Sequence, residues 1–175
     1  MKEAPLSSSE AAQAVVAWAD MHGELISNKK LQKLLYYVQA WSLVFYRPLF
    51  DEDFQAWVHG PVAPSVYEEY KKFGYGTVKL EYADGENAQS KFSALAAKIG
   101  DKQWAEFILK VLGKYGAFSA IELEMLSHSE KPWKRARKGL GPLEPSNAII
   151  DQTTMKSFYK NLIDGKKEKE RPRPL

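Results

Sequence analysis

The chain has 175 residues, of which 45% are hydrophobic and 13% aromatic. This apolar content is enough for one packed domain and excludes a chain that is disordered throughout. The absence of cysteine excludes disulfides and thiolate chemistry. The net charge is +3, but the last eleven residues hold five Lys or Arg and two Glu, so the rest of the chain is neutral. The basicity therefore belongs to the tail and does not by itself indicate nucleic acid.

The sequence also bears on the compartment. The first ten residues contain no apolar run of the kind found in signal peptides. No segment approaches the roughly 18 consecutive apolar residues of a membrane span. We therefore expect a soluble, cytoplasmic protein with no membrane partner.

Two helices are predicted in the first 48 residues. Ser7 and Glu10 form a capping box before an Ala-rich segment that ends at His22-Gly23. The second helix begins near Ser27 or Asn28 and stops before Pro48, because the residue before a proline is disfavoured in a helix. The residues on its apolar face, which we expect in the core, are Leu31, Leu34, Leu35 and Val38.

The middle of the chain gives weaker signals. Residues 54–58 predict a short strand or extended segment, and Gly60-Pro61 is expected to break regular structure. Pro64 opens a Tyr-rich helix through Tyr70. Residues 77–80 resemble a strand, residues 83–90 a polar loop, and residues 92–99 either a short helix or an irregular segment.

Four segments complete the C-terminal half. Asp101 caps an amphipathic helix with an expected break at residues 113–116, and Ser119 with Glu122 forms a second capping box before a helix that ends near His128. Residues 132–138 predict a short basic helix. Asp151 caps a last helix that we expect to end at Gly165. These elements predict a mainly α, single compact domain of about six or seven helices over residues 1–164, with a disordered charged tail at 165–175.

Catalytic patterns are absent from the sequence. The three histidines, His22, His59 and His128, are scattered and belong to no nucleophile or zinc motif. Gly74 and Gly76 lack the rest of a phosphate-binding loop. We therefore predict no enzymatic activity, no metal and no cofactor.

The aromatic side chains between residues 36 and 70 allow two interpretations. They are either core residues or anchors of a binding surface, since Tyr and Trp stabilise interfaces at low entropic cost. Tyr36 and Tyr37 differ by about 100° around the helix, so they cannot face the same way. We expect at least one or two of the five aromatics to stay accessible: Tyr36, Tyr37, Trp41, Tyr67 and Tyr70.

Two further segments leave alternatives open. Trp57 and His59 are either core and turn residues beside Gly60-Pro61, or a rigid exposed site that grips a partner. The five cations of residues 131–138 could contact phosphates, but a solvated helix face with Trp133 buried is the simpler interpretation. We accordingly do not expect a nucleic-acid partner.

Four segments of the chain occur together in a recognisable order: KLQKLLYYVQAWSL, PLFDEDFQAWVHGPVAPSVYEEY, YGAFSAIELEMLSHSEKPWKRAR and the helix around SFYKNLI. Through these segments the chain resembles the Panacea domain of SocA-like antitoxins, a family that includes phage-associated members, and the resemblance follows the family's order. It spans residues 10–163, whereas residues 77–100 and the tail match no pattern of the family.

The resemblance implies an antitoxin that binds and neutralises a cognate toxin protein encoded nearby, by direct contact. Two alternatives stay open: a proteolytic adaptor that delivers a toxin to a protease, and a transcriptional regulator that binds DNA through residues 131–138. The residues expected at the toxin contact, each of which also has a possible structural role, are Lys33, Tyr37, Trp41, His59, Pro61, Tyr67, His128 and Trp133.

Overall fold

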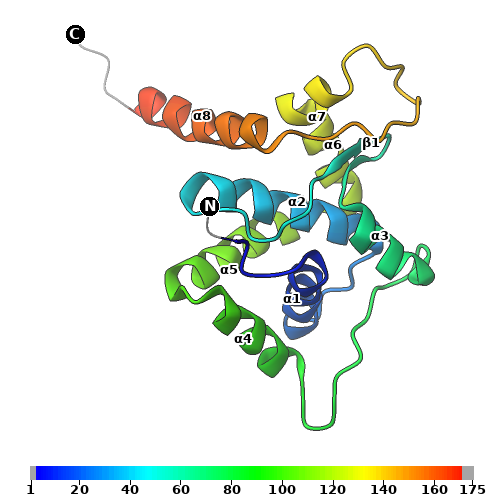
Figure 1. The fold of residues 1–175 in the computed structure, drawn as a ribbon, viewed down its shortest axis with the longest axis vertical. Coiled ribbons are helices and arrows are strands. Elements are labelled where there is room, and N and C mark those ends of the chain that lie inside the picture. The colour runs from blue at the N-terminus through cyan, green and yellow to red at the C-terminus, as the bar shows by residue number, and fades with distance from the viewer. Residues whose placement is uncertain (1–2, 171–175) are drawn as a thin grey trace.

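The computed structural model describes residues 3–170, and the side chains of residues 3–165. This part of the chain forms eight α-helices, a short 3-10 helix and one small antiparallel sheet (Figure 1). The predicted mainly α class is confirmed, with eight helices in place of six or seven. In chain order the elements are α1 (Ser8–Met21), α2 (Asn28–Phe45), β1 (Gln55–Trp57), β2 (Gly60–Val62), α3 (Pro64–Tyr70), η1 (Lys71–Phe73), α4 (Ala88–Ile99), α5 (Lys102–Gly116), α6 (Ala120–Ser129), α7 (Lys131–Ala136) and α8 (Gln152–Glu170).

Helix α2 lies at the centre of the fold. It packs against α1, α5, α6, α8 and β2, and Figure 1 shows it crossing between α8 on one side and α1 on the other. Every residue from 31 to 40 is buried, so the four predicted core residues are confirmed. Tyr36 and Tyr37 are both buried although they point in different directions, because neighbours surround α2 on all sides. Of the five aromatics in question, Trp41 and Tyr67 stay partly accessible.

The strand expected around residues 54–58 is present as β1, but it pairs with a second strand that was not predicted. Residues 60–62 form β2, which pairs antiparallel with β1 in the register Ala56 to Pro61 and Trp57 to Gly60. The expectation that Gly60-Pro61 interrupts regular structure is therefore wrong. Pro61 is tolerated here because a two-stranded sheet consists only of edge strands.

Three other expectations are corrected by the structure. Residues 77–80 form no strand beyond a bridge between Ser27 and Thr77, and the polar loop is shorter than expected because α4 begins at Ala88. Helix α5 continues through Gly113 to Gly116, where a Cβ atom would collide with the indole of Trp18. Glycine at 116 thus serves close helix packing rather than a helix stop.

The last helix is also longer than predicted. Gly165 does not end α8, which extends to Glu170, and residues 171–175 of the expected tail lie outside the described residues. By contrast, the capping boxes at Ser7 and Ser119 and the cap at Asp101 form as predicted. No helix in the described part of the chain combines the length and apolar character that crossing a membrane requires.

Candidate interaction surface

The hairpin formed by β1 and β2 is held to the body by side chains of two segments. Helix α2 holds β2 and the residue after it, while α7 and the residue that follows α7 hold β1. Because the acceptors and donors on the hairpin are mainly backbone groups, its position is fixed independently of most of its side chains. The bonds are Lys33 Nζ to Pro61 O at 3.0 Å, Ala63 N to Gln32 Oε1 at 2.9 Å, Trp133 Nε1 to Trp57 O at 3.0 Å, and Arg137 Nη1 to Ala56 O at 3.0 Å.

Lys33 is a buried amine beneath the hairpin. Its exposed fraction is 1%, and burial lowers its pKa to about 7, with Glu124 opposing and Lys29 adding to this effect. Gly60 makes room for it: the backbone there has φ +98°, and a Cβ atom would lie 2.6 Å from Lys33 Cε. The left-handed backbone favours glycine at this position, and an added Cβ atom would force the end of the buried Lys33 side chain to shift.

At the surface above Lys33, three charged or ionisable side chains meet. Glu124 on α6 makes an ion pair with Lys29, and its Oε1 lies 3.1 Å from Nδ1 of His59. Burial raises the pKa of Glu124, but the hydrogen bonds from Lys29 and His59 outweigh it and the net shift is downward. The His59 side chain is 73% exposed. The hairpin thus presents an accessible imidazole that is held in place by a carboxylate.

His128 and Trp133 form the neighbouring part of this region. Their rings stack with centroids 4.0 Å apart, and both residues are half-buried. The Nε2 atom of His128 is buried and has no hydrogen-bond partner among the described residues. Burial lowers the pKa of His128, which favours the neutral ring. Trp133 in turn bonds the hairpin, so the stack links α6 to β1 through α7.

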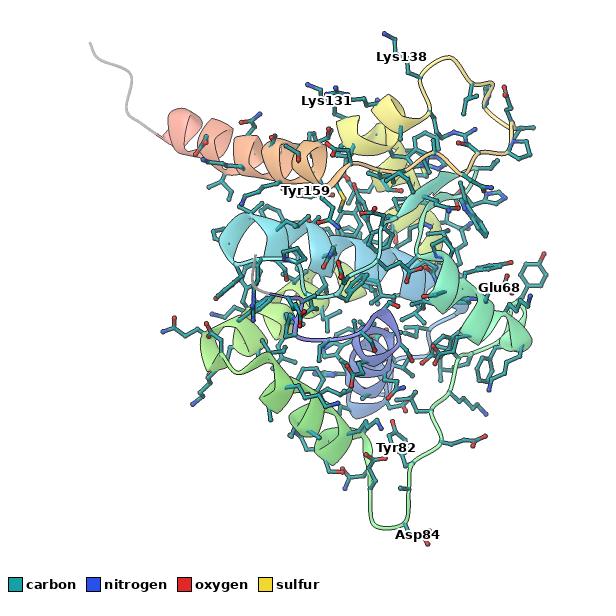
Figure 2. The ribbon with its side chains drawn as sticks, viewed as in Figure 1. Glu68, Tyr82, Asp84, Lys131, Lys138 and Tyr159 are labelled. Carbon is teal, nitrogen blue, oxygen red and sulfur yellow. The ribbon has the colours of Figure 1, made fainter. Side chains whose placement is uncertain are left out.

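A second buried ionisable group lies at the junction of α6 and α7, where it contacts α2. Glu130 accepts hydrogen bonds from Tyr159 at 2.6 Å and from Tyr37 at 3.5 Å. Burial raises its pKa to about 7 although both tyrosines oppose the shift. Figure 2 shows Tyr159 between α8 and α2, so this cluster joins α8 to the central helix. The role of Glu130 is to connect helices inside the protein.

Helix α6 exposes apolar side chains on its outer face. Ile121 is 65% exposed and Met125 is 67% exposed, and Phe118 just before the helix is 39% exposed. Ile121 and Met125 are one turn apart, and Met125 is three residues from His128, so they share a continuous face. The buried residues of α6, Leu123 and Ser127, face the opposite side. An apolar face of this kind, flanked by the His59–Glu124 pair, is typical of a protein-binding surface.

The comparisons with known proteins place this region within a family. Residues 31–134 match the family described as Antitoxin SocA-like, Panacea domain. The chain belongs to the Panacea-domain family. It is also 36% identical over 118 residues to Antitoxin SocA of Caulobacter vibrioides (strain NA1000 / CB15N), an alignment that covers 66% of this chain and 62% of that protein. The chain thus spans less than two thirds of the relative it matches. No solved structure matches the chain significantly.

The Panacea segment contains all eight residues that the sequence analysis singled out, but the structure gives them different surroundings. Five of them gather at the hairpin: Lys33, His59, Pro61, His128 and Trp133. Tyr67 packs edge-on against Trp57 with centroids 4.9 Å apart, also on the hairpin. Trp41 lies elsewhere, where it donates a hydrogen bond to the Tyr115 hydroxyl at 2.8 Å. Tyr37 is buried against Glu130.

Burial separates these residues into two groups. Lys33, Tyr37 and Pro61 are buried, and their polar atoms or carbonyls serve internal hydrogen bonds. His59 is exposed, and the remaining four are partly exposed. Ile121 and Met125 on α6 were not among the residues predicted from the sequence. Apolar residues occur on both the Leu123 side and the opposite side of α6, and this pattern shows that one side is not core but not which one.

Proposed function

We propose that this protein is a non-enzymatic antitoxin that binds and neutralises a toxin protein encoded beside it through direct contact. Membership of the Panacea family and the likeness to a protein named as an antitoxin support this role. The observation that carries the direct-contact mechanism is the exposed apolar face of α6 at Ile121 and Met125, next to His59, whose ring contacts Glu124.

The proposed contact surface consists of the α6 face and the hairpin tip. Apolar side chains at the centre of an interface supply most of its affinity, and a charged rim supplies orientation. Ile121 and Met125 take the first role, while His59 and the Lys29–Glu124 pair take the second. Lys33 and Pro61 contribute indirectly, because they fix the hairpin that carries His59.

The partly exposed aromatics border this surface. Tyr67 and Trp133 both contact the hairpin, so a partner seated over His59 would reach them. Trp41 is excluded from the proposed contact because it lies on α5's side of α2. The proposed toxin contact therefore keeps four of the residues suggested by the sequence, His59, Tyr67, His128 and Trp133. Ile121 and Met125 are added from the structure.

The test is co-expression of this chain with the product of the adjacent gene. Growth arrest caused by the neighbour alone should be relieved by the wild-type chain, and the two purified proteins should co-elute. Ile121→Asp and Met125→Asp should each lose rescue and co-elution. Leu143→Asp is the matched control, because Leu143 is 81% exposed and lies outside the family segment. Rescue that survives both α6 variants would refute the proposed surface, and the absence of both arrest and co-elution with the wild-type chain would refute the antitoxin role.

A further inference from the structure

The charge of this protein is divided unevenly along the chain. Residues 1–130 contain 13 basic and 17 acidic residues, whereas residues 131–175 contain 12 basic and 5 acidic residues. The first part is therefore negative by four charges and the second positive by seven. Three of these seven positive charges belong to residues 165–175, and residues 131–164 supply the other four. The charge count alone does not identify a ligand, so the placement of the cations in the fold must carry the inference.

The fold gathers described cations of this part on α7 and α8, which pack together. On α7, Lys131, Lys134 and Arg135 are spaced three or four residues apart and so share one face, and Lys138 follows the end of the helix. On α8, Lys156 and Lys160 are one turn apart. Figure 2 shows Lys131 and Lys138 pointing away from the body, at the end of the molecule opposite Asp84. We call this set the basic face: Lys131, Lys134, Arg135, Lys138, Lys156 and Lys160, all exposed.

These cations are available to a ligand. None of the six makes a salt bridge with a carboxylate whose side chain the structure describes. Arg137, the remaining cation of the segment, is different: it is buried and donates to three backbone carbonyls, at Ala56, Gly141 and Glu144. One cation thus fixes the segment from the inside while its neighbours face solvent.

A hollow of about 270 Å³ lies between α7 and α8 within the basic face. Lys131 and Arg135 line it on one side, and Ser157 and Asn161 supply hydroxyl and amide donors on the other. Asp151 also lines it, and its carboxylate already accepts hydrogen bonds from the backbone and hydroxyl of Thr154 at the start of α8. The start of α8 is therefore already capped by Asp151. The groups in the hollow that can bind a phosphate are the cations and the polar side chains.

We propose that the basic face binds the phosphate backbone of double-stranded nucleic acid without reading its sequence. Several separated cations beside hydroxyl and amide donors suit a row of phosphates, because such contacts position a protein on a duplex without base readout. The basic face shares no residue with the surface proposed for the toxin, although Trp133 of that surface lies on the same helix α7. Binding to a duplex and binding to a toxin are therefore separate properties of the chain.

The test measures the binding of the purified full chain to a fluorescent 30-base-pair DNA duplex of mixed sequence, by anisotropy from 50 to 200 mM salt. The wild type should bind, and a second sequence of equal length should bind equally. The double variant Lys131→Ala/Arg135→Ala should weaken binding roughly tenfold or more at 50 mM salt and reduce the salt slope by about two. The matched control Lys79→Ala/Lys110→Ala removes two exposed cations from the acidic part and should leave affinity within about twofold.

Three results would overturn the proposal: no binding of the wild type at 50 mM salt, equal losses in the test and control variants, or polyglutamate displacing the duplex at equal charge concentration. The last result would assign the basic face to an acidic protein partner.

An RNA duplex that binds like the DNA duplex supports recognition of phosphates. Circular dichroism melts of both double variants confirm folding. The antitoxin role is tested by a separate measurement, the rescue of growth. Both double variants should still rescue growth if the toxin binds α6.

Discussion

The Nζ atom of Lys33 donates a hydrogen bond to the carbonyl oxygen of Pro61 over 3.0 Å, inside the protein and below the exposed ring of His59. No carboxylate among the described residues forms a salt bridge with this amine. The bond connects the central helix to the hairpin, so the protonation of Lys33 is linked to the stability of the region that we propose to bind a toxin.

The first prediction concerns the pH dependence that Lys33 confers. Its pKa falls from 10.5 to about 7 in the folded protein, so between these values the unfolded chain binds the proton and the folded protein does not. The contribution of Lys33 to the free energy of unfolding therefore increases with pH between these two values, by up to about 1.4 kcal/mol per pH unit. Urea unfolding of the wild type and Lys33→Met from pH 6 to 9 should show this slope only in the wild type. Parallel curves would contradict it.

The second prediction concerns Glu130, whose contribution to the free energy of unfolding changes with pH in the opposite direction. Its pKa rises from 4.5 to about 7 on folding, so the folded protein binds the proton more tightly and stability from this residue declines as pH rises across that window. Glu130→Gln keeps an acceptor for Tyr159 but cannot ionise. The free energy of unfolding of this variant should lack the decline between pH 5 and 7 and should equal or exceed that of the wild type at pH 7.5. A variant much less stable than the wild type at pH 7.5 would refute this account.

The third prediction tests why position 60 is glycine. Gly60→Ala combines a left-handed backbone with a Cβ atom 2.6 Å from Lys33 Cε, and should reduce the free energy of unfolding by about 2 kcal/mol or more. Gly85→Ala is the matched control, because its φ is +77° but nothing lies within 4 Å of the added atom. Urea denaturation should rank Gly60→Ala below Gly85→Ala. Equal losses would show that backbone strain alone matters.

The fourth prediction separates Arg137 from the exposed cations beside it. Arg137→Lys cannot reproduce the three carbonyl contacts of the guanidinium and should cost about 2 kcal/mol of stability. Arg135→Lys changes an exposed side chain in the same way and should stay within about 0.5 kcal/mol of the wild type. Equal melting temperatures for the two variants would mean that the buried guanidinium does not hold the hairpin.

Local signals in the sequence predicted what depends on neighbouring residues. The caps at Ser7, Asp101 and Ser119 and the core face of α2 follow from short-range hydrogen bonding and helical periodicity, and the structure confirms them. The mainly α class follows from the same signals.

Features that depend on distant contacts could not be predicted in this way. Gly116 predicts a helix stop from the sequence, but in the structure it allows the indole of Trp18 on α1 to pack closely against α5. The sequence left Tyr37 open as either a core residue or a contact residue, and its burial depends on distant partners such as Glu130 and Tyr159. Ile121 and Met125 were missed because apolar residues on a helix are ordinarily core, and only the three-dimensional arrangement shows that nothing in the described part of the chain covers them.

The central claim is that the α6 face binds a toxin, and calorimetry with the purified product of the adjacent gene tests it most directly. Ile121→Asp and Met125→Asp should each weaken binding roughly thirtyfold or more, because a charge at the centre of an apolar interface is left unpaired. Leu143→Asp should bind like the wild type, and unchanged melting temperatures should accompany all three variants. Wild-type affinity in both α6 variants would contradict the account.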